Sequence, residues 1–400
     1  MDVEQLKANP GVERWVYWIV LFLMAFIILG LGMGIGALLR HRAEGVQVFV
    51  IGDWGRRGDG QTDTANLMLH LARAHRPDMI VSTGDNFYPT GLRGPKDTEN
   101  FNKSFREPYA DLIDIPWHAV LGNHDYGDGD RPDSADRDCV LYEGTCKRLD
   151  TDNPCCYSPL HQLNVRLRTD PQMGDSRWHA HRNTQLVLGN SLVEFFYIDT
   201  SPGVKVYMDN ATATNNTDDD TRMTPTPRPS SAMPWVSGSG PGGLHEQSWA
   251  ANLMELESAL AASTAKWKIV VGHHPVYTYS FHATDGTTVP SLEAVLRRAR
   301  VRLYLNGHDH CLQLIEKTGA QGTVKSESIV YATSGAGSKV FKGFPGIKPG
   351  QSRPGDAKYL QDKEGMLRVT VPPAEDVLVL EFFTAEGKGH KPDYKHIIKH

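Results

Sequence analysis

The chain has few cysteines and no excess of basic residues. Its 400 residues include five cysteines, and 42 Lys and Arg against 47 Asp and Glu give a formal net charge of −5 at pH 7. Proteins that bind nucleic acid usually carry a basic excess, so this charge balance argues against a nucleic-acid partner. Hydrophobic residues make up 40% of the chain, which is enough to bury a large core.

Charged residues are also absent from a long N-terminal stretch. From Trp15 to Leu39 there is no Asp, Glu, Lys or Arg, and Ile, Leu, Val, Phe and Met dominate. A helix of this length exceeds the ~20 residues that cross a bilayer. We expect a transmembrane signal anchor at 15–39, preceded by a tail at 1–14. A cleaved signal peptide is the alternative, because small residues occur at 34–37, although its apolar region usually has about 7–15 residues.

Features after this stretch indicate the secretory pathway. Glycosylation triplets of the form Asn-X-Ser/Thr begin at Asn102, Asn210 and Asn215. Four cysteines cluster in one loop-rich stretch, at Cys139, Cys146, Cys155 and Cys156. This pattern is typical of two disulfides, with reduced thiols or a structural metal site as the alternative. Cys311 is expected to be a buried free thiol.

The flanking charges of the N-terminal stretch are balanced and do not set its orientation. The glycosylation triplets and the cysteines therefore decide the expected topology. We predict a single-pass membrane protein whose main domain is lumenal or extracellular. The sequence leaves the oligomeric state open.

Five short apolar runs rich in valine and isoleucine predict strands, and each ends directly before a polar motif. These runs are 47–51, 79–82, 117–121, 268–271 and 301–305. Apolar residues at helical spacing predict helices at 62–76 and 246–262. Strands that alternate with helices pair in parallel, and sites in such sheets form at the carboxyl ends of the strands.

The five motifs carry the residue types of a two-metal site. In chain order they are Gly52-Asp53-Trp54-Gly55, Gly84-Asp85-Asn86-Phe87-Tyr88, Gly122-Asn123-His124-Asp125, Gly272-His273-His274-Pro275 and Gly307-His308-Asp309-His310. One such stretch alone is weak evidence, because Asp, Asn and His beside Gly are common in turns and helix caps. Together they supply oxygen and nitrogen ligands for two ions, which indicates phosphoester hydrolysis.

The ordered set resembles the calcineurin-like metallophosphoesterases, and Tyr88 narrows the resemblance to the purple acid phosphatase family, which includes the tartrate-resistant acid phosphatases. Most of the wider superfamily carry Asp-x-His in the first motif, whereas this chain has Asp53-Trp54-Gly55 and lacks that histidine. Tyr88, three residues after Asp85, takes its place. A phenol has a pKa near ~10, so it binds as phenolate in acid only beside a strong Lewis acid such as Fe(III). The alternative is that Tyr88 is a packed aromatic residue.

The resemblance implies a set of metal ligands. Fe(III) would be bound by Asp53, Tyr88 and His310, with Asp85 bridging both ions. A divalent ion, Fe(II), Zn(II) or Mn(II), would be bound by Asn123, His273 and His308.

The resemblance also implies roles for histidines that are not ligands. A metal-bound hydroxide would attack phosphorus, with His282 as general acid and His124 as phosphate contact or co-acid. For His282, a loop residue, the alternative is a solvated side chain. His274 is expected to lie behind the ligands or to face the substrate rather than bind metal. We expect surface positions for His70, His75, His179 and His181.

The fold implied by the resemblance is an α/β metallophosphoesterase β-sandwich of two mixed sheets flanked by α-helices, within a catalytic domain at 46–400. Strands at 192–198, 328–333, 366–371 and 377–383 are expected to complete the second sheet. Two segments depart from the small animal enzymes of the family. One is a cysteine-containing insertion at about 127–182, and the other is a low-complexity loop at about 205–243. Because loops at the rim of a site shape access, they leave the substrate preference open.

The predicted function is an acid phosphatase that hydrolyses small phosphomonoesters. One alternative is a dimetal phosphodiesterase or nucleotide pyrophosphatase of the same superfamily. A remote alternative is a non-catalytic membrane receptor on this fold. That alternative predicts a damaged site, yet each expected ligand position carries a suitable residue.

Overall fold

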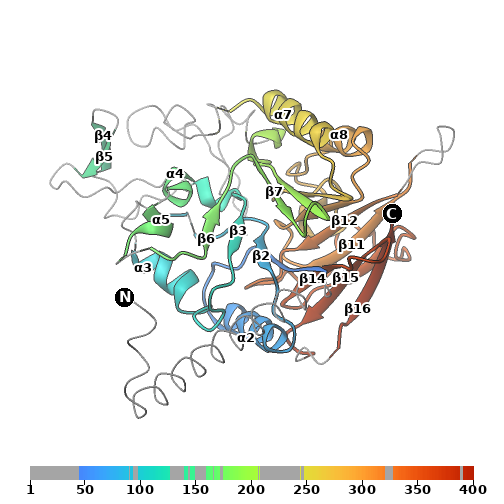
Figure 1. Cartoon of the computed structure of the whole chain (residues 1–400), viewed down its shortest axis with the longest axis horizontal. Coiled ribbons are helices and arrows are strands. Elements are labelled where there is room, and N and C mark those ends of the chain that lie inside the picture. The colour runs from blue at the N-terminus through green and yellow to red at the C-terminus, as the bar shows by residue number, and fades with distance from the viewer. Residues whose placement is uncertain are drawn as a thin grey trace, which may run out of the picture. The chain divides into compact units, whose positions relative to one another are not determined.

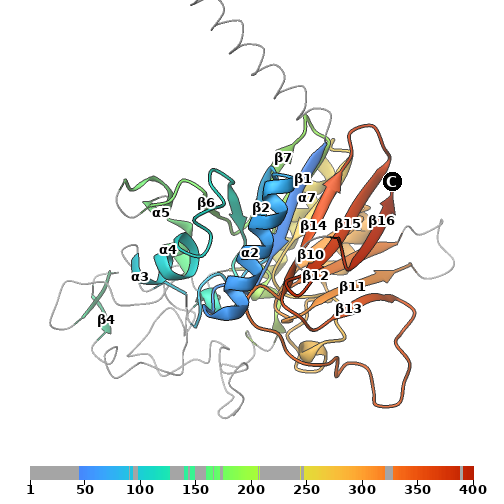
Figure 2. The same ribbon diagram turned by 90° about the horizontal axis from the view of Figure 1, so that it is seen from below.

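The computed structural model describes residues 45–89, 91–92, 98–126, 139–142, 145–148, 159–164, 166–171, 174–205, 207, 244, 247–319, 328–387 and 391–400. The chain from Val46 to His400 forms one compact unit. Within it, two seven-stranded sheets pack face to face, and helices lie on their outer faces (Figures 1 and 2). The predicted sandwich of two mixed sheets is confirmed.

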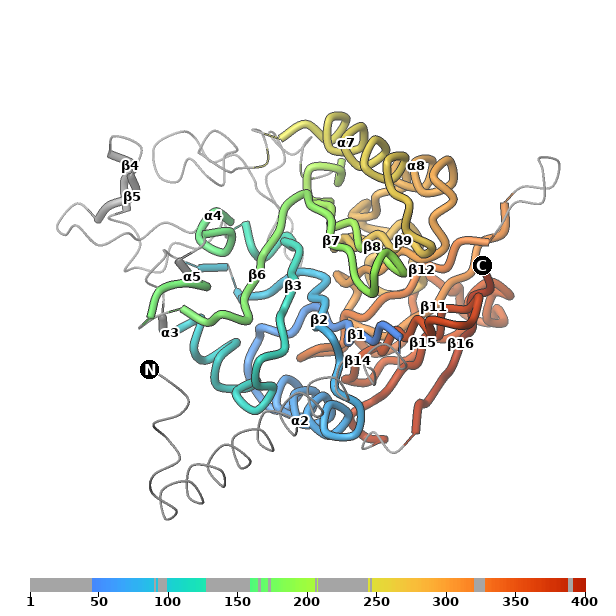
Figure 3. The backbone as a smooth tube through the Cα atoms, in the orientation of Figure 1, coloured from blue at the N-terminus to red at the C-terminus, as the bar shows by residue number. Residues whose placement is uncertain are grey.

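The first sheet carries three of the five motifs. Its strand order is β16 (Tyr394–Lys399), β15 (Val377–Thr384), β14 (Gly365–Val371), β1 (Val46–Ile51), β2 (Met79–Ser82), β3 (Trp117–Ala119) and β6 (Trp178–Ala180). From β1 to β6 the neighbours are parallel, so their carboxyl ends lie at one edge. Figure 3 traces the chain through these strands, which lie side by side.

The second sheet carries the other two motifs. Its order is β13 (Ala357–Gln361), β11 (Leu312–Lys317), β12 (Ile329–Ser334), β10 (Leu303–Asn306), β9 (Trp267–Val271), β8 (Val193–Tyr197) and β7 (Thr184–Leu188). The strands β8, β9, β10 and β12 are parallel, and the outer strands are antiparallel to their neighbours. Leucine, valine and isoleucine from both sheets fill the space between them.

The expected sheet assignment of two late strands is wrong. Residues 366–371 and 377–383 belong to β14 and β15, which lie in the first sheet, where β14 pairs antiparallel with β1. The strands predicted at 192–198 and 328–333 do lie in the second sheet, as β8 and β12. An apolar pattern predicts that a strand is buried but does not specify its neighbour. The strand β1 pairs with β2 on one side and with β14 on the other, and this second pairing places β14 in the first sheet.

Helices cover the outer faces of both sheets. The helix α2 (Asp59–Ala74) buries Leu67, Met68 and Leu71 in the cluster on the outer face of the first sheet. The helices α7 (Trp249–Ala262) and α8 (Leu292–Arg298) pack on the second sheet. At the start of α7, the Ala251 N–H donates to the Ser248 hydroxyl, which caps the helix. The helices predicted at 62–76 and 246–262 are confirmed, with shifted ends.

Short elements connect these layers. They are α3 (Thr98–Phe101), the π-helical turn η2 (Asn102–Arg106), α4 (Pro159–Leu163), α5 (Arg166–Thr169), the hairpin of β4 (Cys139–Tyr142) and β5 (Thr145–Arg148), and the 3₁₀ turns η3 (His124–Tyr126), η4 (Ser201–Gly203) and η6 (Phe281–Ala283). Cys311 is a buried free thiol, as predicted.

Several predictions lie outside the described residues. They concern the anchor at 15–39, the glycosylation sites Asn210 and Asn215, most of the loop at 205–243, and the side chains of the four clustered cysteines. Among the residues that the structure does describe, none of the helices is both long and apolar enough to span a membrane.

Three histidines cluster at the edge of the first sheet. The Nδ1 atom of His118 lies 2.8 Å from Nε2 of His181, and the His118 ring stacks on His179 and on His181. The surface position expected for His179 and His181 is wrong, because β6 pairs in register with β3 and brings both half-buried rings beside His118. His70 and His75 are exposed, as predicted.

This cluster should make the fold less stable in acid. Burial, reinforced by the neighbouring histidines, lowers the pKa of His118 to about 3, and burial likewise lowers the pKa of His181 to about 4. Unfolded histidine has a pKa of ~6.5, so the unfolded chain binds more protons between these values and stability falls as the pH drops below ~6.5.

We therefore expect the His181→Gln variant to lose less thermal stability between pH 7 and pH 4 than the unaltered protein. Thermal unfolding at both pH values measures this, with the exposed His70→Gln as control. An equal fall in Tm for all three proteins would contradict the assignment.

Candidate metal centre

The five motifs meet where the parallel strands of the two sheets end. Asp53 follows β1, Asp85 and Tyr88 follow β2, Asn123 follows β3, His273 follows β9, and His308 and His310 follow β10. Each of these side chains is at most 6% exposed. The sandwich thus gathers all predicted ligands into one buried polar cluster, although they come from both sheets.

One half of the cluster surrounds the Tyr88 hydroxyl. This oxygen lies 3.3 Å from Oδ1 of Asp53, 3.1 Å from Oδ2 of Asp85 and 3.2 Å from Nε2 of His310. The same His310 nitrogen is 3.5 Å from Oδ1 of Asp53. A phenol, two carboxylates and an imidazole therefore converge on one point, so Tyr88 is not merely a packed aromatic residue.

The other half surrounds His273. Its Nε2 atom lies 3.0 Å from Oδ1 of Asn123 and 3.4 Å from Oδ1 of Asp85. Its Nδ1 atom lies 2.8 Å from the carbonyl oxygen of Thr83, which fixes the ring and leaves Nε2 facing the site. The His308 ring centroid is 5.1 Å from that of His273. Asp85 thus faces both halves.

Two sets of these residues come close enough to hold a cation. Ligand atoms of Asp53, Asp85 and His273 lie within 4.8 Å of one another, as do those of His273, His274 and His308. No lysine or arginine in the described part of the chain pairs with Asp53 or Asp85. Buried carboxylates are costly unless a cation or a hydrogen-bond donor balances them. The donor chemistry therefore fits metal ions.

The pKa shifts of Asp85 and His273 also indicate that a cation fits this cluster. Burial alone would raise the pKa of Asp85, but the nearby His273 and His124 rings hold it well below its usual range. Burial lowers the pKa of His273, and the Asp85 and Asp53 carboxylates outweigh this and raise it to about 9. A proton on His273 thus balances the carboxylates at the place where a cation fits.

Local backbone geometry brings the ligands together. Asp53, Asp85 and His308 have φ angles of 57°, 52° and 68°, in the left-handed region that non-glycine residues rarely adopt. A Cβ atom at Gly122 would lie 2.1 Å from Oδ1 of Asp85, so this position needs glycine. Such strain is typical of functional sites, where the surrounding structure maintains it.

Comparison with known proteins identifies the family. Residues 46–312 match the calcineurin-like phosphoesterase family. The chain is 34% identical to purple acid phosphatase 17 of Arabidopsis thaliana over 80% of this chain and 76% of that protein. It is 31% identical to purple acid phosphatase 4 of the same plant over 94% of this chain and 93% of that protein. The chain belongs to the purple acid phosphatases.

Other relatives agree with this assignment. Tartrate-resistant acid phosphatase type 5 of Sus scrofa is 26% identical over 79% of this chain. Two solved structures share the fold. GAP50, the anchor in the inner membrane complex of Plasmodium, has a TM-score of 0.56 at 20% identity and 88% coverage of each chain. Purple acid phosphatase PPD1 of yellow lupin has a TM-score of 0.52 at 13% identity, over 88% of this chain and 53% of that one.

This purple acid phosphatase is a metal-dependent phosphoester hydrolase, and its family implies a dinuclear metal site. Two histidines that are not predicted ligands border that site. The His124 ring lies 4.1 Å from the Tyr88 ring, and its backbone N–H donates to Oδ1 of Asp85. The His282 ring stacks on His308 with centroids 3.9 Å apart. His282 is buried, so the structure does not place it in solvent.

His274 lies behind the ligands of the purple acid phosphatase. Its Nδ1 atom is 2.9 Å from the Thr200 hydroxyl, and its Nε2 atom is 3.2 Å from the Tyr207 hydroxyl. Both ring nitrogens therefore have partners outside the ligand set. Because His274 also lies in one of the two sets close enough to hold a cation, its supporting role stays a prediction.

The sequence did not predict a role for two carboxylates at the site. Asp285 contacts Nδ1 of His282 and accepts hydrogen bonds from the Thr287 N–H and hydroxyl. Asp125 accepts from the backbone N–H groups of Gly122, Asn86 and Phe87 and so ties the second motif to the third. Asp125 was visible as the last residue of its motif, and Asp285 as a carboxylate three residues after His282.

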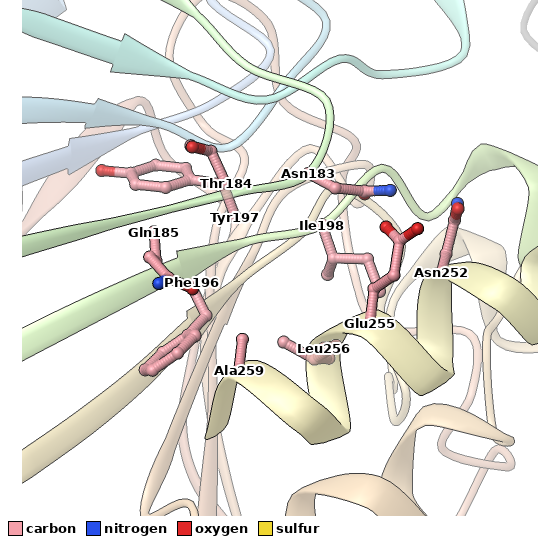
Figure 4. Close-up of a pocket in the computed structure, with 10 residues that line it drawn as sticks. All are labelled: Asn183, Thr184, Gln185, Phe196, Tyr197, Ile198, Asn252, Glu255, Leu256 and Ala259. Carbon is pink, nitrogen blue, oxygen red and sulfur yellow. The ribbon is translucent and has the colours of Figure 1, made fainter. Parts of the chain in front are cut away.

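A pocket separate from the metal centre lies between β7, β8 and α7 (Figure 4). Its volume is about 200 Å³. Asn183, Asn252 and Glu255 line one end, and Phe196 and Ala259 line the other. None of the predicted ligands borders it.

Proposed function

We propose that this purple acid phosphatase hydrolyses small phosphomonoesters at a site that holds Fe(III) and a divalent ion, with His282 as general acid. The observation that carries the proposal is the Tyr88 hydroxyl, which lies within 3.3 Å of Asp53, Asp85 and His310. A phenol in an acidic solution needs a strong Lewis acid to ionise. Asp53, Tyr88 and His310 would hold Fe(III), and Asp85 would contact both ions.

Asn123, His273 and His308 would hold the divalent ion, which would be Fe(II), Zn(II) or Mn(II). Their amide oxygen and imidazole nitrogens suit any of the three. When bound, the two ions would supply an activated water and stabilise negative charge on the phosphoryl oxygens.

The leaving alkoxide needs a proton, and we assign its donation to His282, which stacks on His308 at the border of the centre. The Asp285 carboxylate contacts Nδ1 of His282 and would hold the ring in one orientation. The His282 backbone N–H also donates to Oδ1 of Asp309, which fixes the turn against the last motif. His124, beside Tyr88 and Asp85, would contact the phosphate or act as a second acid.

We expect the effect of His282→Ala to depend on the leaving group. Nitrophenolate departs without a proton, whereas an alkoxide requires one, so kcat for an alkyl phosphate should fall roughly 100-fold or more and kcat for p-nitrophenyl phosphate much less. Steady-state kinetics with both substrates measures the difference. Asp285→Asn should give the same pattern in weaker form. Equal losses on both substrates would contradict a general-acid role.

The same proposal includes the setting of the enzyme. The apolar stretch at 15–39 would anchor the protein, with the catalytic domain in the lumen of the secretory pathway or outside the cell. The glycosylation triplets and the clustered cysteines support this topology. Alkaline carbonate extraction tests the anchor, since release of the full-length protein would refute it.

The function itself is tested with enzyme purified from a secretory host. Metal analysis should give about two ions per chain, one of them iron, together with a visible absorption band. Turnover should be higher for phosphomonoesters than for bis-(p-nitrophenyl) phosphate or pyrophosphate. A preference for diesters or pyrophosphate would instead favour a diesterase or pyrophosphatase.

A further inference from the structure

A cleft of about 730 Å³ opens beside the metal centre on the side of Tyr88. The loop after β1, the start of α2 and the segment after β12 form its walls. Tyr88 and Ser338 connect it to the centre, because the Tyr88 hydroxyl contacts the ligands and the Ser338 hydroxyl donates to the backbone oxygen of Asp53. The cleft therefore borders the predicted metal centre through Tyr88.

Three cations line this cleft: Arg56, Arg57 and Lys339. The Arg56 guanidinium lies over the Tyr88 ring, 4.2 Å from its centroid. Lys339 lies 4.8 Å from the centroid of Phe341, whose ring stacks on His310 at 4.7 Å. Both cations thus rest on aromatic rings that belong to the ligands or pack against them.

Two of these charges have no carboxylate partner in the part of the chain that the structure describes. Arg57 donates to Oδ1 of Asn100 at 2.6 Å and to the Ser104 hydroxyl at 3.2 Å, and both acceptors are neutral. Among the described residues, Lys339 forms no ion pair, and neither does Arg57. The side chain of Arg57 is therefore held in place without being neutralised.

The acidic residues of the cleft offset only part of this charge. Glu99 pairs with Lys103 at 2.7 Å, and Asp59 lies in the first turn of α2, where the helix dipole favours a carboxylate. Arg57 also has a φ angle of 66°, so its backbone is held in an unfavourable conformation. The rim next to Tyr88 is thus positively charged, with a fixed guanidinium.

We propose that this cleft binds a second phosphate of the substrate, so that the enzyme prefers small molecules that carry two phosphates a short distance apart. This inference rests on the proposed phosphomonoesterase function and adds a substrate class to it. Arg57 and Lys339 would contact the second phosphate, because guanidinium and ammonium groups bind phosphate oxygens. Arg56 lies over the ring of Tyr88, a predicted metal ligand that lines the cleft. A phosphate bound in the cleft would therefore lie close to the scissile phosphate, and only a short linker would separate the two.

The test compares matched substrates. Propyl phosphate carries one primary alkyl phosphate and 1,3-propanediol bisphosphate carries two equivalent ones, so kcat/KM is compared per phosphate group, and longer diol bisphosphates vary the spacing. We expect kcat/KM to be roughly tenfold higher for the short bisphosphate, and the advantage to decline with a longer linker and with added salt. Equal kcat/KM for propyl phosphate and the bisphosphate would overturn the inference and leave the proposed function intact. Absence of turnover with every phosphomonoester would overturn both.

Variants of the cleft residues test whether their side chains cause the preference for the bisphosphate. Lys339→Gln and Arg57→Gln should each reduce the ratio of kcat/KM for the bisphosphate to that for propyl phosphate by roughly three- to tenfold, because both side chains are exposed. Lys342→Gln is the control, since this exposed lysine donates to the Asp362 backbone oxygen and does not line the cleft. If the Arg57 variant fails to fold, the exposed Lys339 provides the test alone. An unchanged ratio in the Lys339 variant would contradict the assignment.

Discussion

Replacing Asp85 with asparagine should reduce kcat/KM for p-nitrophenyl phosphate by roughly a thousandfold or more, since loss of several kcal/mol of metal-dependent stabilisation has that effect. Asp85 is 1% exposed and faces both halves of the centre, with Oδ1 at 3.4 Å from His273 and Oδ2 at 3.1 Å from Tyr88. Asparagine has nearly the same shape but carries no negative charge. It therefore cannot hold two cations together.

Metal content should fall along with activity, because Asp85 is the only predicted ligand expected to contact both ions. Mass spectrometry of the purified variant measures this directly. Asp175→Asn is a suitable control, since Asp175 pairs with Arg177 away from the centre. That variant should keep both its metals and its activity. An Asp85→Asn variant with full metal content and unchanged activity would show that hydrolysis occurs elsewhere.

On the proposed Fe(III) assignment, replacing Tyr88 with phenylalanine should abolish the expected visible absorption band. The hydroxyl is the only group that this change removes, and it lies 3.2 Å from the His310 nitrogen and 3.3 Å from Asp53. A charge-transfer band from phenolate to Fe(III) requires that oxygen. We expect the band to disappear, iron to bind more weakly, and kcat to fall roughly tenfold or more, since an anionic ligand of the Lewis acid is lost.

Tyr126 provides a matched control for this experiment. It is a buried tyrosine close to the same motifs, but its hydroxyl contacts Asp199 and Gln247 rather than the predicted ligands. Tyr126→Phe should keep the visible band. Persistence of the band in Tyr88→Phe would contradict the assignment of Fe(III) to the half of the centre that contains Asp53 and His310.

Local sequence patterns predicted the elements that carry the site. The apolar runs before the motifs are the strands β1, β2, β3, β9 and β10, and each ends where it was expected to end, within a residue or two. Period and composition are sufficient here because a buried parallel strand must be continuously apolar and must stop where polar ligands begin. The sheet that the resemblance implied for β14 and β15 and the surface position expected for His179 and His181 were wrong, because strand pairing decides the environment there.

The cleft beside Tyr88 could not be predicted from the sequence. Arg56 and Arg57 are adjacent to the first motif, but Lys339 is far along the chain, and only the packing of the two sheets brings them together. Asp285 shows the same limit, because a carboxylate near a histidine in sequence becomes a partner only when the turn at 281–285 folds back.

The sequence by itself determined the residue types of the metal centre, their order, and the presence of Tyr88 in place of the histidine expected after Asp53. These are properties of short segments, because the functional groups in a motif do not depend on which other segments pack against it. The tertiary structure decided which atoms face one another: the convergence on the Tyr88 hydroxyl, the position of Asp85 between both halves, and the positive cleft at the rim. Contacts between distant segments depend on how two sheets pack, and packing is a property of the whole domain rather than of any one segment.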